Sequence, residues 1–292
     1  MKVISKIYGG LGNQMFQYAC GRALANRLRA RLYLDISWFD NGNRVFMLDN
    51  FPNINYSLPP YRNYFERKII ALNRKIMRRL GIQLIRDIHE LEDFIYWQGM
   101  EQINSSVILD GYWQNEKYFL NISSIIRKDF TFDEFDCFEA KDIAKKIRES
   151  TCSISIHVRR GDYVEKPETN SFHGTCSLDY YRNALQIIIN KHEGELTPEL
   201  FLFSDDPDWL KNNFDTCGLP SVIIDIPDHK DKPYHDMHLM SLCQQHIIAN
   251  SSFSWWGAWL SSGNGMVIAP KRWVAVETMK DRNPSLESWI LI

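Results

Sequence analysis

The chain has 292 residues, of which 45% are hydrophobic and 24% are charged, an ordinary globular composition and enough length for one large domain or two lobes. Its 34 basic and 36 acidic residues leave a formal net charge of -2, so the overall charge provides no attraction for nucleic acid. The sequence shows neither a signal-peptide pattern nor an apolar run long enough to span a bilayer. We therefore expect a cytoplasmic protein whose six scattered cysteines carry reduced thiols rather than a zinc site.

The first half of the chain has less regular patterning than the second. In chain order it is predicted to contain a strand over 2–8, a helix over 12–29, a strand over 31–36, a loop rich in Asn, Pro and aromatic residues over 38–60, a basic helix over 61–86, a strand over 107–109, an aromatic loop over 110–114 and a helix over 141–148. The basic helix could touch an anionic membrane surface weakly, but such a face is more often only solvated.

The second half alternates short apolar strands with helices. Strands are predicted over 152–158, 200–203, 221–226, 246–249 and 266–269, and helices over 178–191, 208–214, 236–244 and 253–260. This alternation is typical of parallel α/β sheets. We expect two Rossmann-like lobes, residues 1–150 and 151–270, with a tail over 271–292 that packs back on the first lobe.

Two adjacent arginines directly follow the buried strand at 152–158. Arg159 and Arg160 are followed by Gly161 and Asp162, and His157 precedes them. In open α/β sheets, ligands bind at the carboxyl ends of the strands, and the planar guanidinium group matches phosphate oxygens. The pair therefore suggests a diphosphate site held by arginine. Surface salt bridges with Asp162 are the alternative interpretation.

Polar residues also follow two later strands of the same predicted sheet. Ser204, Asp205 and Asp206 follow one strand, and residues 250–252 and Ser254 follow another. Because parallel strands place their carboxyl ends at one edge, these groups should converge with the arginines. A carboxylate such as Asp205 can accept two hydrogen bonds from guanine. Asp206 and Ser252 could equally be helix caps.

A glycine-rich turn, Gly9-Gly10-Leu11-Gly12-Asn13, joins the first strand to the first helix. Glycines let a ligand approach the backbone, and the following helix N-terminus attracts anions. The turn lacks the lysine of a P-loop, which argues against an ATPase or a kinase.

Asp206-Pro207-Asp208 allows a different class of site, because two such carboxylates can hold manganese on a nucleotide sugar. Pro207 instead favours a turn into a helix that Asp206 caps. The arginines already supply positive charge, so we expect no metal or other cofactor.

Four motifs, in order, closely resemble those of glycosyltransferase family 11: GGLGNQMFQY at 9–18, HVRRGDY at 157–163, FSDD at 203–206 and NSSFSWWGAW at 250–259. The similarity continues to the PKRW run at 270–273 and the SWI run at 288–290. It implies a GT-B fold of two facing lobes with a nucleotide-sugar cleft, and a metal-independent galactoside 2-α-L-fucosyltransferase that uses GDP-fucose. Bacterial members act in the cytoplasm on O-antigen, capsule or related oligosaccharides.

The resemblance also implies roles for individual residues. Arg159 would bind the β-phosphate with help from Arg160, while His157 and Asp205 would meet guanine. Asn13, in the turn that contains Gly10 and Gly12, would reach the phosphates from the first lobe. Further donor contacts are expected from Ser204, Ser252, Phe253 and Ser254. The catalytic base stays open among Asp162, Glu165 and Glu168.

We therefore expect an inverting fucosyltransferase that acts on a galactose-containing oligosaccharide, with residues 41–60 and 110–114 shaping the acceptor pocket. Two alternatives stay open. One is a metal-dependent transferase that uses Asp206 and Asp208, and the other is a non-catalytic glycan-binding module, suggested by the nine tryptophans.

Overall fold

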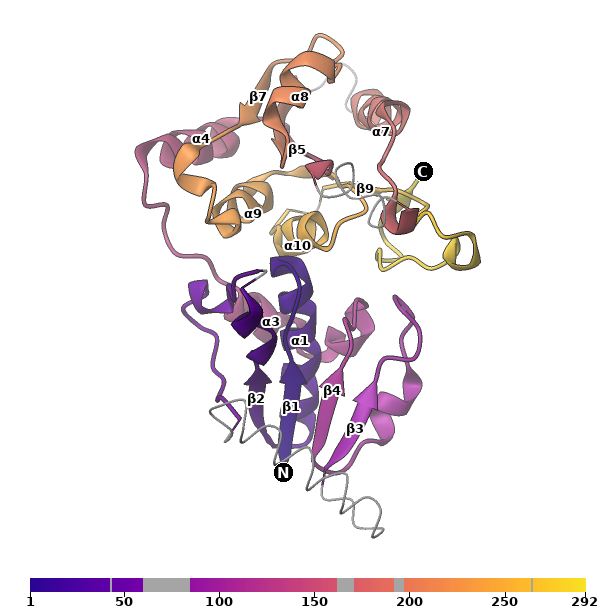
Figure 1. Cartoon of the computed structure of the whole chain (residues 1–292). Helices are drawn as coiled ribbons and strands as arrows, with labels where there is room; N and C mark the ends of the chain where they lie inside the picture. The colour runs from indigo at the N-terminus through magenta and orange to yellow at the C-terminus, as the bar shows by residue number, and fades with distance from the viewer. Residues whose placement is uncertain (43, 60–84, 162–170, 192–196, 264) are drawn as a thin grey trace. The chain divides into compact units, whose positions relative to one another are not determined.

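The computed structural model describes residues 1–42, 44–59, 85–161, 171–191, 197–263 and 265–292. The chain divides into two compact units, Met1–Thr131 and Phe132–Ile292 (Figure 1). Three of the predicted candidates, Asp162, Glu165 and Glu168, lie outside the described residues. Most of the predicted basic helix over 61–86 lies outside them too.

Unit 1 contains a parallel four-stranded sheet in the order β2-β1-β4-β3. Its strands and α-helices are β1 (Lys2–Lys6), α1 (Leu11–Arg27), β2 (Arg31–Asp35), β3 (Arg86–His89), β4 (Val107–Asp110) and α3 (Ser123–Asp129). Short 3-10 helices occupy Ser37–Asn41, Leu48–Asn50, Gln98–Gln102, Glu116–Tyr118 and Leu120–Ile122. The region 38–60 therefore has more local structure than the expected loop.

Helix α1 packs closely on strand β1. A Cβ added to Gly21 would lie 2.9 Å from the Cβ of Ser5, so glycine permits this approach. The Ser5 hydroxyl, fully buried, donates a hydrogen bond of 2.8 Å to the carbonyl of Gln17. Strand and helix are thereby fixed together, and the turn between them, Tyr8–Gly10, lies at the carboxyl end of the sheet.

Unit 2 contains a parallel six-stranded sheet in the order β10-β9-β8-β5-β6-β7. Its strands are β5 (Ser153–Val158), β6 (Glu199–Ser204), β7 (Ser221–Ile224), β8 (Gln245–Ile247), β9 (Val267–Ala269) and β10 (Ile290–Leu291). Its α-helices are α4 (Phe138–Glu149), α7 (Leu178–Lys191), α8 (Pro207–Asn213), α9 (Pro233–Leu242) and α10 (Ser252–Leu260), with 3-10 turns at Pro227–His229 and Glu277–Met279.

Alternating residues of strand β6 enter two different cores. Leu200 and Leu202 pack with residues of α7 and α8, whereas Phe201 and Phe203 pack with residues of α4 and α9. A sheet covered on both faces needs apolar residues at nearly every strand position, as this sequence has. The expected parallel α/β architecture is confirmed.

The boundary between the units lies between Thr131 and Phe132, not near residue 150. Helix α4 belongs to unit 2 because Ala140, Ala144 and Ile147 are buried against its sheet. An amphipathic helix packs on whichever apolar surface completes its core, and the sequence pattern alone does not identify that surface.

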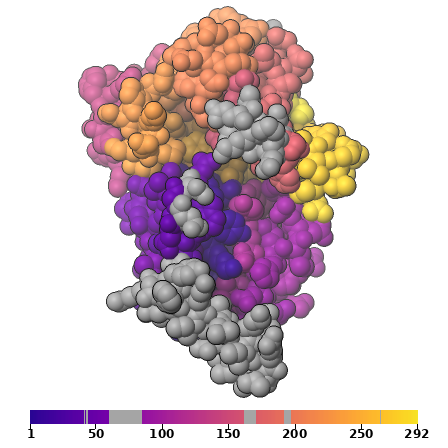
Figure 2. Space-filling model, viewed as in Figure 1, coloured from indigo at the N-terminus to yellow at the C-terminus, as the bar shows by residue number. Residues whose placement is uncertain are grey.

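The C-terminal tail is part of unit 2, contrary to the prediction that it packs back on the first lobe. Strand β10 extends the sheet beside β9, and the Lys271 backbone N–H donates a hydrogen bond of 2.7 Å to the Ile292 carbonyl. The Trp289 ring lies 5.6 Å from the Trp255 ring. These last residues are yellow on the surface in Figure 2.

The predicted helix over 61–86 cannot include Arg86, because that residue begins β3, a strand that the sequence reasoning missed. Most other predicted elements are confirmed within a few residues. Within the described parts of the chain, no helix is both long and apolar enough to cross a bilayer.

Candidate active site

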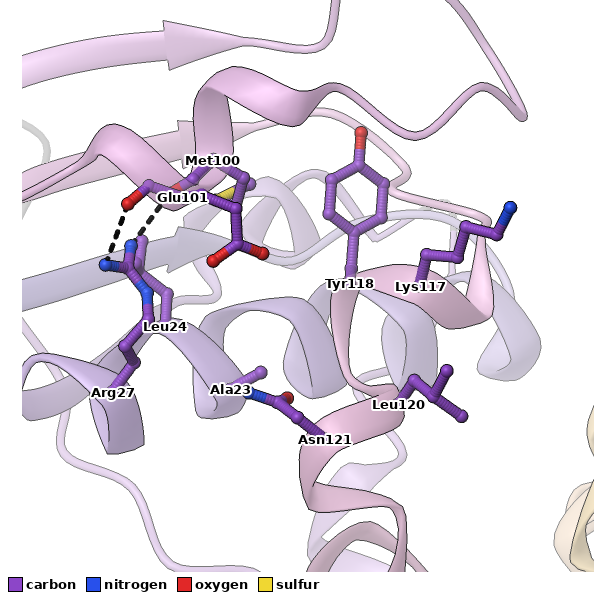
Figure 3. A pocket seen from close by; sticks show the side chains of 9 residues that line it. All are labelled: Ala23, Leu24, Arg27, Met100, Glu101, Lys117, Tyr118, Leu120 and Asn121. Carbon is purple, nitrogen blue, oxygen red and sulfur yellow. Dashed lines mark hydrogen bonds between the residues drawn. The ribbon is translucent and has the colours of Figure 1, made fainter.

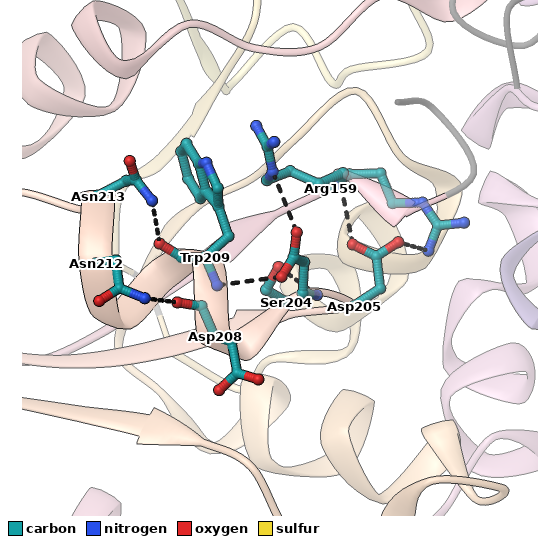
Figure 4. Close-up of polar contacts among 9 residues, drawn as sticks. Arg159, Ser204, Asp205, Asp208, Trp209, Asn212 and Asn213 are labelled. Atoms are coloured by element: carbon teal, nitrogen blue, oxygen red, sulfur yellow. Dashed lines mark hydrogen bonds and ion pairs between the residues drawn. The ribbon is translucent and has the colours of Figure 1, made fainter. Parts of the chain in front are cut away.

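Strand register brings the predicted phosphate-binding arginine beside Asp205. Val158 at the end of β5 pairs with Ser204 at the end of β6, so the next residues of both strands are neighbours. Arg159 Nη1 lies 2.9 Å from Asp205 Oδ2 (Figure 4). Their side chains are 23% and 25% exposed, so solvent and ligands can reach this ion pair.

Arg160 is held by three contacts. Its backbone N–H donates a hydrogen bond of 2.9 Å to Asp205 Oδ1, and its Nε lies 3.5 Å from Asp206 Oδ2. Its guanidinium lies 3.9 Å from the centre of the Trp209 ring, a cation–π geometry. Together these contacts orient the guanidinium group before any ligand binds.

Gly161 leaves room for the Asp205 carboxylate. A Cβ at this position would lie 2.4 Å from Asp205 Oδ2, far inside contact distance. Any larger residue here would force the Asp205 carboxylate away from its present position. The sequence HVRRGD thus combines its two cations with a residue that leaves the adjacent carboxylate in place.

The two carboxylates of the Asp-Pro-Asp run point to different partners. Asp206 caps α8, because its Oδ1 accepts a hydrogen bond of 3.1 Å from the Trp209 backbone N–H. Asp208 is 89% exposed in its side chain and pairs with Lys211 at 3.1 Å. Ser204 Oγ accepts a hydrogen bond of 3.0 Å from the Asp206 backbone N–H, so it stabilises the same turn.

His157 is buried at the end of β5, with 4% of its surface exposed. Burial and, secondly, the nearby Arg159 charge lower its pKa from 6.5 to about 3, so the ring is neutral. Its ring lies 5.7 Å from that of Phe253, and the described residues provide no hydrogen-bond partner for its Nδ1. A buried polar atom without a partner costs roughly 1–3 kcal/mol, which a ligand that binds it can recover.

The serines that open α10 differ in their roles. Ser251, rather than Ser252, is the N-cap, because its side chain accepts a hydrogen bond of 3.3 Å from the Phe253 backbone N–H. Ser254 is 2% exposed, and its hydroxyl lies 3.3 Å from the Ser251 carbonyl and 3.4 Å from that of Ala249. The Ser254 hydroxyl therefore faces the backbone.

Asn250 connects separate segments of unit 2. Its Nδ2 lies within 2.9 Å of the His173 carbonyl and 3.2 Å of the Gly174 and Trp273 carbonyls. Its Oδ1 accepts a hydrogen bond of 3.5 Å from the Cys176 thiol. This amide therefore stabilises the loops around the strand ends.

The glycine turn of unit 1 lies at the carboxyl end of its own sheet. Gly9 has φ +80, a conformation that favours glycine, whereas Gly10 has φ -77 and nothing within 4 Å of an added Cβ. The fold itself therefore does not require glycine at position 10, where serine would cap α1 better. A bare backbone at a helix N-terminus leaves space for an anion. Gly12 is buried in the first turn of α1.

Asn13 Oδ1 accepts a hydrogen bond of 2.9 Å from Gln114 Nε2. Gln114 follows β4, so this bond connects the glycine turn to the aromatic loop over 110–114. Sequence reasoning placed Gln114 in the loop expected to shape the acceptor pocket, but it did not predict this contact with Asn13. The order of β1 and β4 in the sheet, which brings the two together, is not visible in the sequence.

Glu90 holds the aromatic loop of unit 1. Its two carboxylate oxygens accept hydrogen bonds of 2.6 Å from the Tyr112 N–H and 3.0 Å from the Trp113 N–H. Burial raises its pKa from 4.5 to about 7, although these two hydrogen bonds act in the opposite direction. Trp113 has φ +56, so the clamp stabilises a backbone conformation that is rare for a large side chain.

Aromatic rings lie at the same edge of unit 1. The Tyr8 ring lies 5.1 Å from that of Tyr112 and 6.5 Å from that of Trp38. Tyr112 is 39% exposed and Trp38 is 38% exposed. Asp110, at the end of β4, forms an ion pair of 2.6 Å with Lys6. This combination of rings and charged groups suits a sugar.

A pocket of about 310 Å³ in unit 1 lies elsewhere (Figure 3). It is lined by Ala23, Leu24, Arg27, Met100, Glu101, Lys117, Tyr118, Leu120 and Asn121. Ala23 follows Asn13 by ten residues of α1, which corresponds to roughly 15 Å along the helix. The pocket is therefore beside the last turns of α1, away from the strand ends where ligands bind in this type of sheet.

The structure thus gathers His157, Arg159, Arg160, Ser204 and Asp205 at one edge of the unit 2 sheet. Gly10, Gly12 and Asn13 occupy the corresponding edge of unit 1. Sequence reasoning missed Trp209 and Glu90. Only Trp209 had a usable signal, since it falls in the first turn of a helix that the Asp-Pro pair begins.

Comparison with known proteins identifies the family. The family model for glycosyl transferase family 11 matches residues 4–292. An α-1,2-colitosyltransferase of Escherichia coli is 34% identical over 99% of this chain and 98% of that protein. The O-antigen biosynthesis glycosyltransferase WbnK of Escherichia coli is 32% identical over 98% of this chain and 99% of that protein.

More distant matches include proteins whose names describe fucosyltransferases. Galactoside α-(1,2)-fucosyltransferase 1 of Saimiri boliviensis boliviensis is 24% identical over 89% of this chain and 66% of that protein. The solved structure of NodZ α-1,6-fucosyltransferase soaked with GDP-fucose has a TM-score of 0.51 at 16% identity, over 89% of this chain and 92% of that one. That likeness shows the fold, which is of the GT-B type with two Rossmann-like units. By sequence, fold and motif order, the chain belongs to glycosyltransferase family 11 and is a glycosyltransferase.

Proposed function

We propose that this enzyme transfers L-fucose from GDP-fucose to the 2-hydroxyl of a galactose residue on an oligosaccharide, with inversion and without a metal. The observation that carries the proposal is the arginine pair fixed at the carboxyl end of β5 by Asp205, Asp206 and Trp209. The family supports glycosyl transfer, and the printed names of relatives support an α-1,2 linkage and a galactoside.

The arginines suit a departing nucleoside diphosphate. As the bond between the sugar and the β-phosphate breaks, negative charge grows on the phosphate oxygen. A guanidinium that is already oriented stabilises this charge without reorganising, and such electrostatic terms are usually the largest in catalysis. Arg159 would contact the β-phosphate, and Arg160, held over Trp209, would assist.

Guanine recognition would involve His157 and Asp205. The buried Nδ1 of His157 needs a hydrogen-bond partner, which a base can supply. Each oxygen of Asp205 already accepts one hydrogen bond or ion-pair contact, but a carboxylate has about four lone-pair sites. Asp205 can therefore hold the arginines and still accept from guanine. Ser252 and Phe253 would add donor contacts at the start of α10.

The acceptor sugar would bind unit 1. Tyr8, Trp38 and Tyr112 offer rings for stacking on a sugar face, while Asp110 offers a carboxylate for its hydroxyls. The anion-attracting turn at Gly10 would also contribute to phosphate binding, as the family resemblance implies. Asp162, Glu165 and Glu168 stay candidates for the base that removes the proton of the acceptor hydroxyl.

Independence from metal is supported by what the carboxylates already do. Asp206 caps a helix and pairs with Arg160, while Asp208 pairs with Lys211. The arginines supply the positive charge that a divalent ion would otherwise provide. Full activity in excess EDTA is the expected result, and activity that returns only with added manganese would contradict it.

The biological setting proposed is bacterial oligosaccharide synthesis in the cytoplasm, such as O-antigen assembly, supported by the printed function of WbnK. A second donor deserves a direct test, because the relative that is 34% identical is a colitosyltransferase. Colitose is L-fucose without its 3-hydroxyl. GDP-colitose is therefore the alternative donor.

Two measurements test the proposal. Thermal unfolding with GDP, ADP and UDP should show stabilisation by GDP alone. Initial rates should be measured with GDP-fucose and GDP-colitose over a panel of galactosides. GDP-fucose should be consumed, and NMR analysis of the product should show an α-1,2 linkage. A protein that binds glycan but neither binds GDP nor releases it would be a binding module, and the proposal would fail.

A further inference from the structure

A cysteine, a histidine and an aspartate lie in line on the face of unit 2 where α4 and α9 pack together. Cys137 is the N-cap residue of α4, but its side chain makes no capping hydrogen bond. Instead its Sγ lies 3.9 Å from His229 Nε2. Serine, threonine, aspartate and asparagine are the usual caps, so the helix start does not explain this thiol.

His229 is oriented by a carboxylate on its other side. Its Nδ1 lies 2.7 Å from Asp236 Oδ1, and its side chain is 2% exposed whereas that of Asp236 is 30% exposed. A carboxylate at this distance favours a proton on Nδ1, which leaves the Nε2 lone pair facing the thiol. The arrangement is the one by which a histidine removes the proton of a cysteine nucleophile.

A helix terminus and several charged and aromatic side chains surround the thiol and its base. Cys137 lies at the N-terminus of a twelve-residue helix, where the backbone dipole is positive. His235 stacks on His229 with ring centres 4.8 Å apart, and its Nε2 lies 3.4 Å from Asp136 Oδ1. Lys232 forms an ion pair with Asp136. Asp136, the residue before the thiol, is thus paired with two basic side chains.

Cys137 is partly exposed, and its surroundings differ from those of Cys20, Cys152, Cys217 and Cys243. Phe138, next to the thiol, is 78% exposed, and the Asp136 side chain is 47% exposed. Cys20, Cys152 and Cys243 are buried, and burial raises the pKa of each of these thiols. Cys217 is exposed, but burial of part of its side chain and the nearby Asp215 charge raise its pKa.

We propose that Cys137 is a reactive thiol, with His229 as its base and Asp236 as the group that orients the base, and that it forms mixed disulfides with small disulfides such as oxidised glutathione. His229 Nε2 takes the thiol proton. The thiolate attacks one sulfur of the disulfide, a new sulfur–sulfur bond forms and the original one breaks, and the leaving thiolate takes up a proton. This modification site is independent of the proposed sugar transfer.

The test uses the full chain and limiting oxidised glutathione, without donor or acceptor. Peptide mass spectrometry should find glutathione on Cys137 first, ahead of the exposed Cys217. His229→Gln should slow the modification by about a hundredfold or more, because base assistance of this kind is typically worth about two or more orders of magnitude. Asp236→Asn should slow it too, and Cys217→Ser should leave it unchanged.

Thermal unfolding of each variant shows whether it is folded, and Asp236→Asn, whose side chain lies nearer the surface, tests the chemistry if His229→Gln unfolds. Cys137→Ser should transfer sugar at the wild-type rate, because this thiol is not among the donor or acceptor residues. Faster modification of Cys217 than of Cys137, or an unchanged rate at Cys137 in the folded variants, would overturn the proposal.

Discussion

Replacing Arg159 with alanine should remove most of the sugar transfer while unit 2 stays folded. The Arg159 guanidinium is fixed 2.9 Å from Asp205 and is accessible, with 23% of its side chain exposed. Removal of one preorganised donor typically lowers the rate about 10²- to 10³-fold, or roughly 3–4 kcal/mol of transition-state stabilisation. The partly exposed ion pair contributes about 1 kcal/mol or less to folding, so the thermal midpoint should shift little.

The assay is the initial rate of GDP release with a galactoside acceptor, from which kcat and KM are obtained separately. A fall in kcat indicates loss of charge stabilisation in the transition state, whereas a rise in KM alone would indicate ground-state binding. Arg182→Ala is the matched control, because Arg182 also pairs with carboxylates, Asp179 and Asp215, but on the exposed surface of α7. A folded Arg159→Ala enzyme with the turnover of the Arg182→Ala control would refute the assignment.

Three further outcomes are expected. Gly10→Ala should stay folded with a small loss of thermal stability, because an added Cβ meets nothing within 4 Å but alanine is a poorer N-cap than glycine. It should lose about 10²-fold in kcat/KM by blocking ligand approach, and unchanged kinetics would show that the turn binds nothing. Gly161→Ala should abolish thermal stabilisation by GDP, because its Cβ would lie 2.4 Å from Asp205 Oδ2 and displace that carboxylate from Arg159; normal GDP binding would contradict this geometry. Burial raises the pKa of Glu90 from 4.5 to about 7, so this side chain binds its proton more tightly in the folded chain than in the unfolded one. The contribution of Glu90 to stability is therefore greatest below pH 4.5 and falls as the pH rises to 7. Relative to Glu90→Gln, the unfolding free energy of the wild type in urea should therefore drop by up to roughly 3 kcal/mol over that range, and parallel pH profiles would disprove the shift.

Much of unit 2 could be predicted because its local signals agree with its tertiary environment. Both faces of its sheet are covered, so a strand such as Glu199–Ser204, with the sequence Glu-Leu-Phe-Leu-Phe-Ser, reads as a continuous apolar run between helical patterns. Unit 1 gave weaker signals. Strand β3 has the sequence Arg-Asp-Ile-His, with one apolar residue in four, and only its pairing with β4 makes it a strand.

The candidate site shows the same division. The residue types at the ends of β5 and β6 predicted a phosphate site, because guanidinium groups match phosphate oxygens and ligands bind at the carboxyl ends of parallel strands. The contact of Trp209 with Arg160 and the capping role of Ser251 instead depend on side-chain directions that only the folded chain sets. The hydrogen bonds from Tyr112 and Trp113 to Glu90 likewise depend on the pairing of β3 with β4.

By itself, the sequence determined the parallel α/β architecture, the family and the chemistry of the strand ends, because periodicity and residue type act locally. The tertiary structure decided the strand register that sets Arg159 against Asp205, the boundary at Thr131 and the position of the C-terminal tail in unit 2. Those features follow from which apolar surfaces bury each other and which backbone groups pair across the sheet, and such choices depend on the whole chain rather than on any one segment of it.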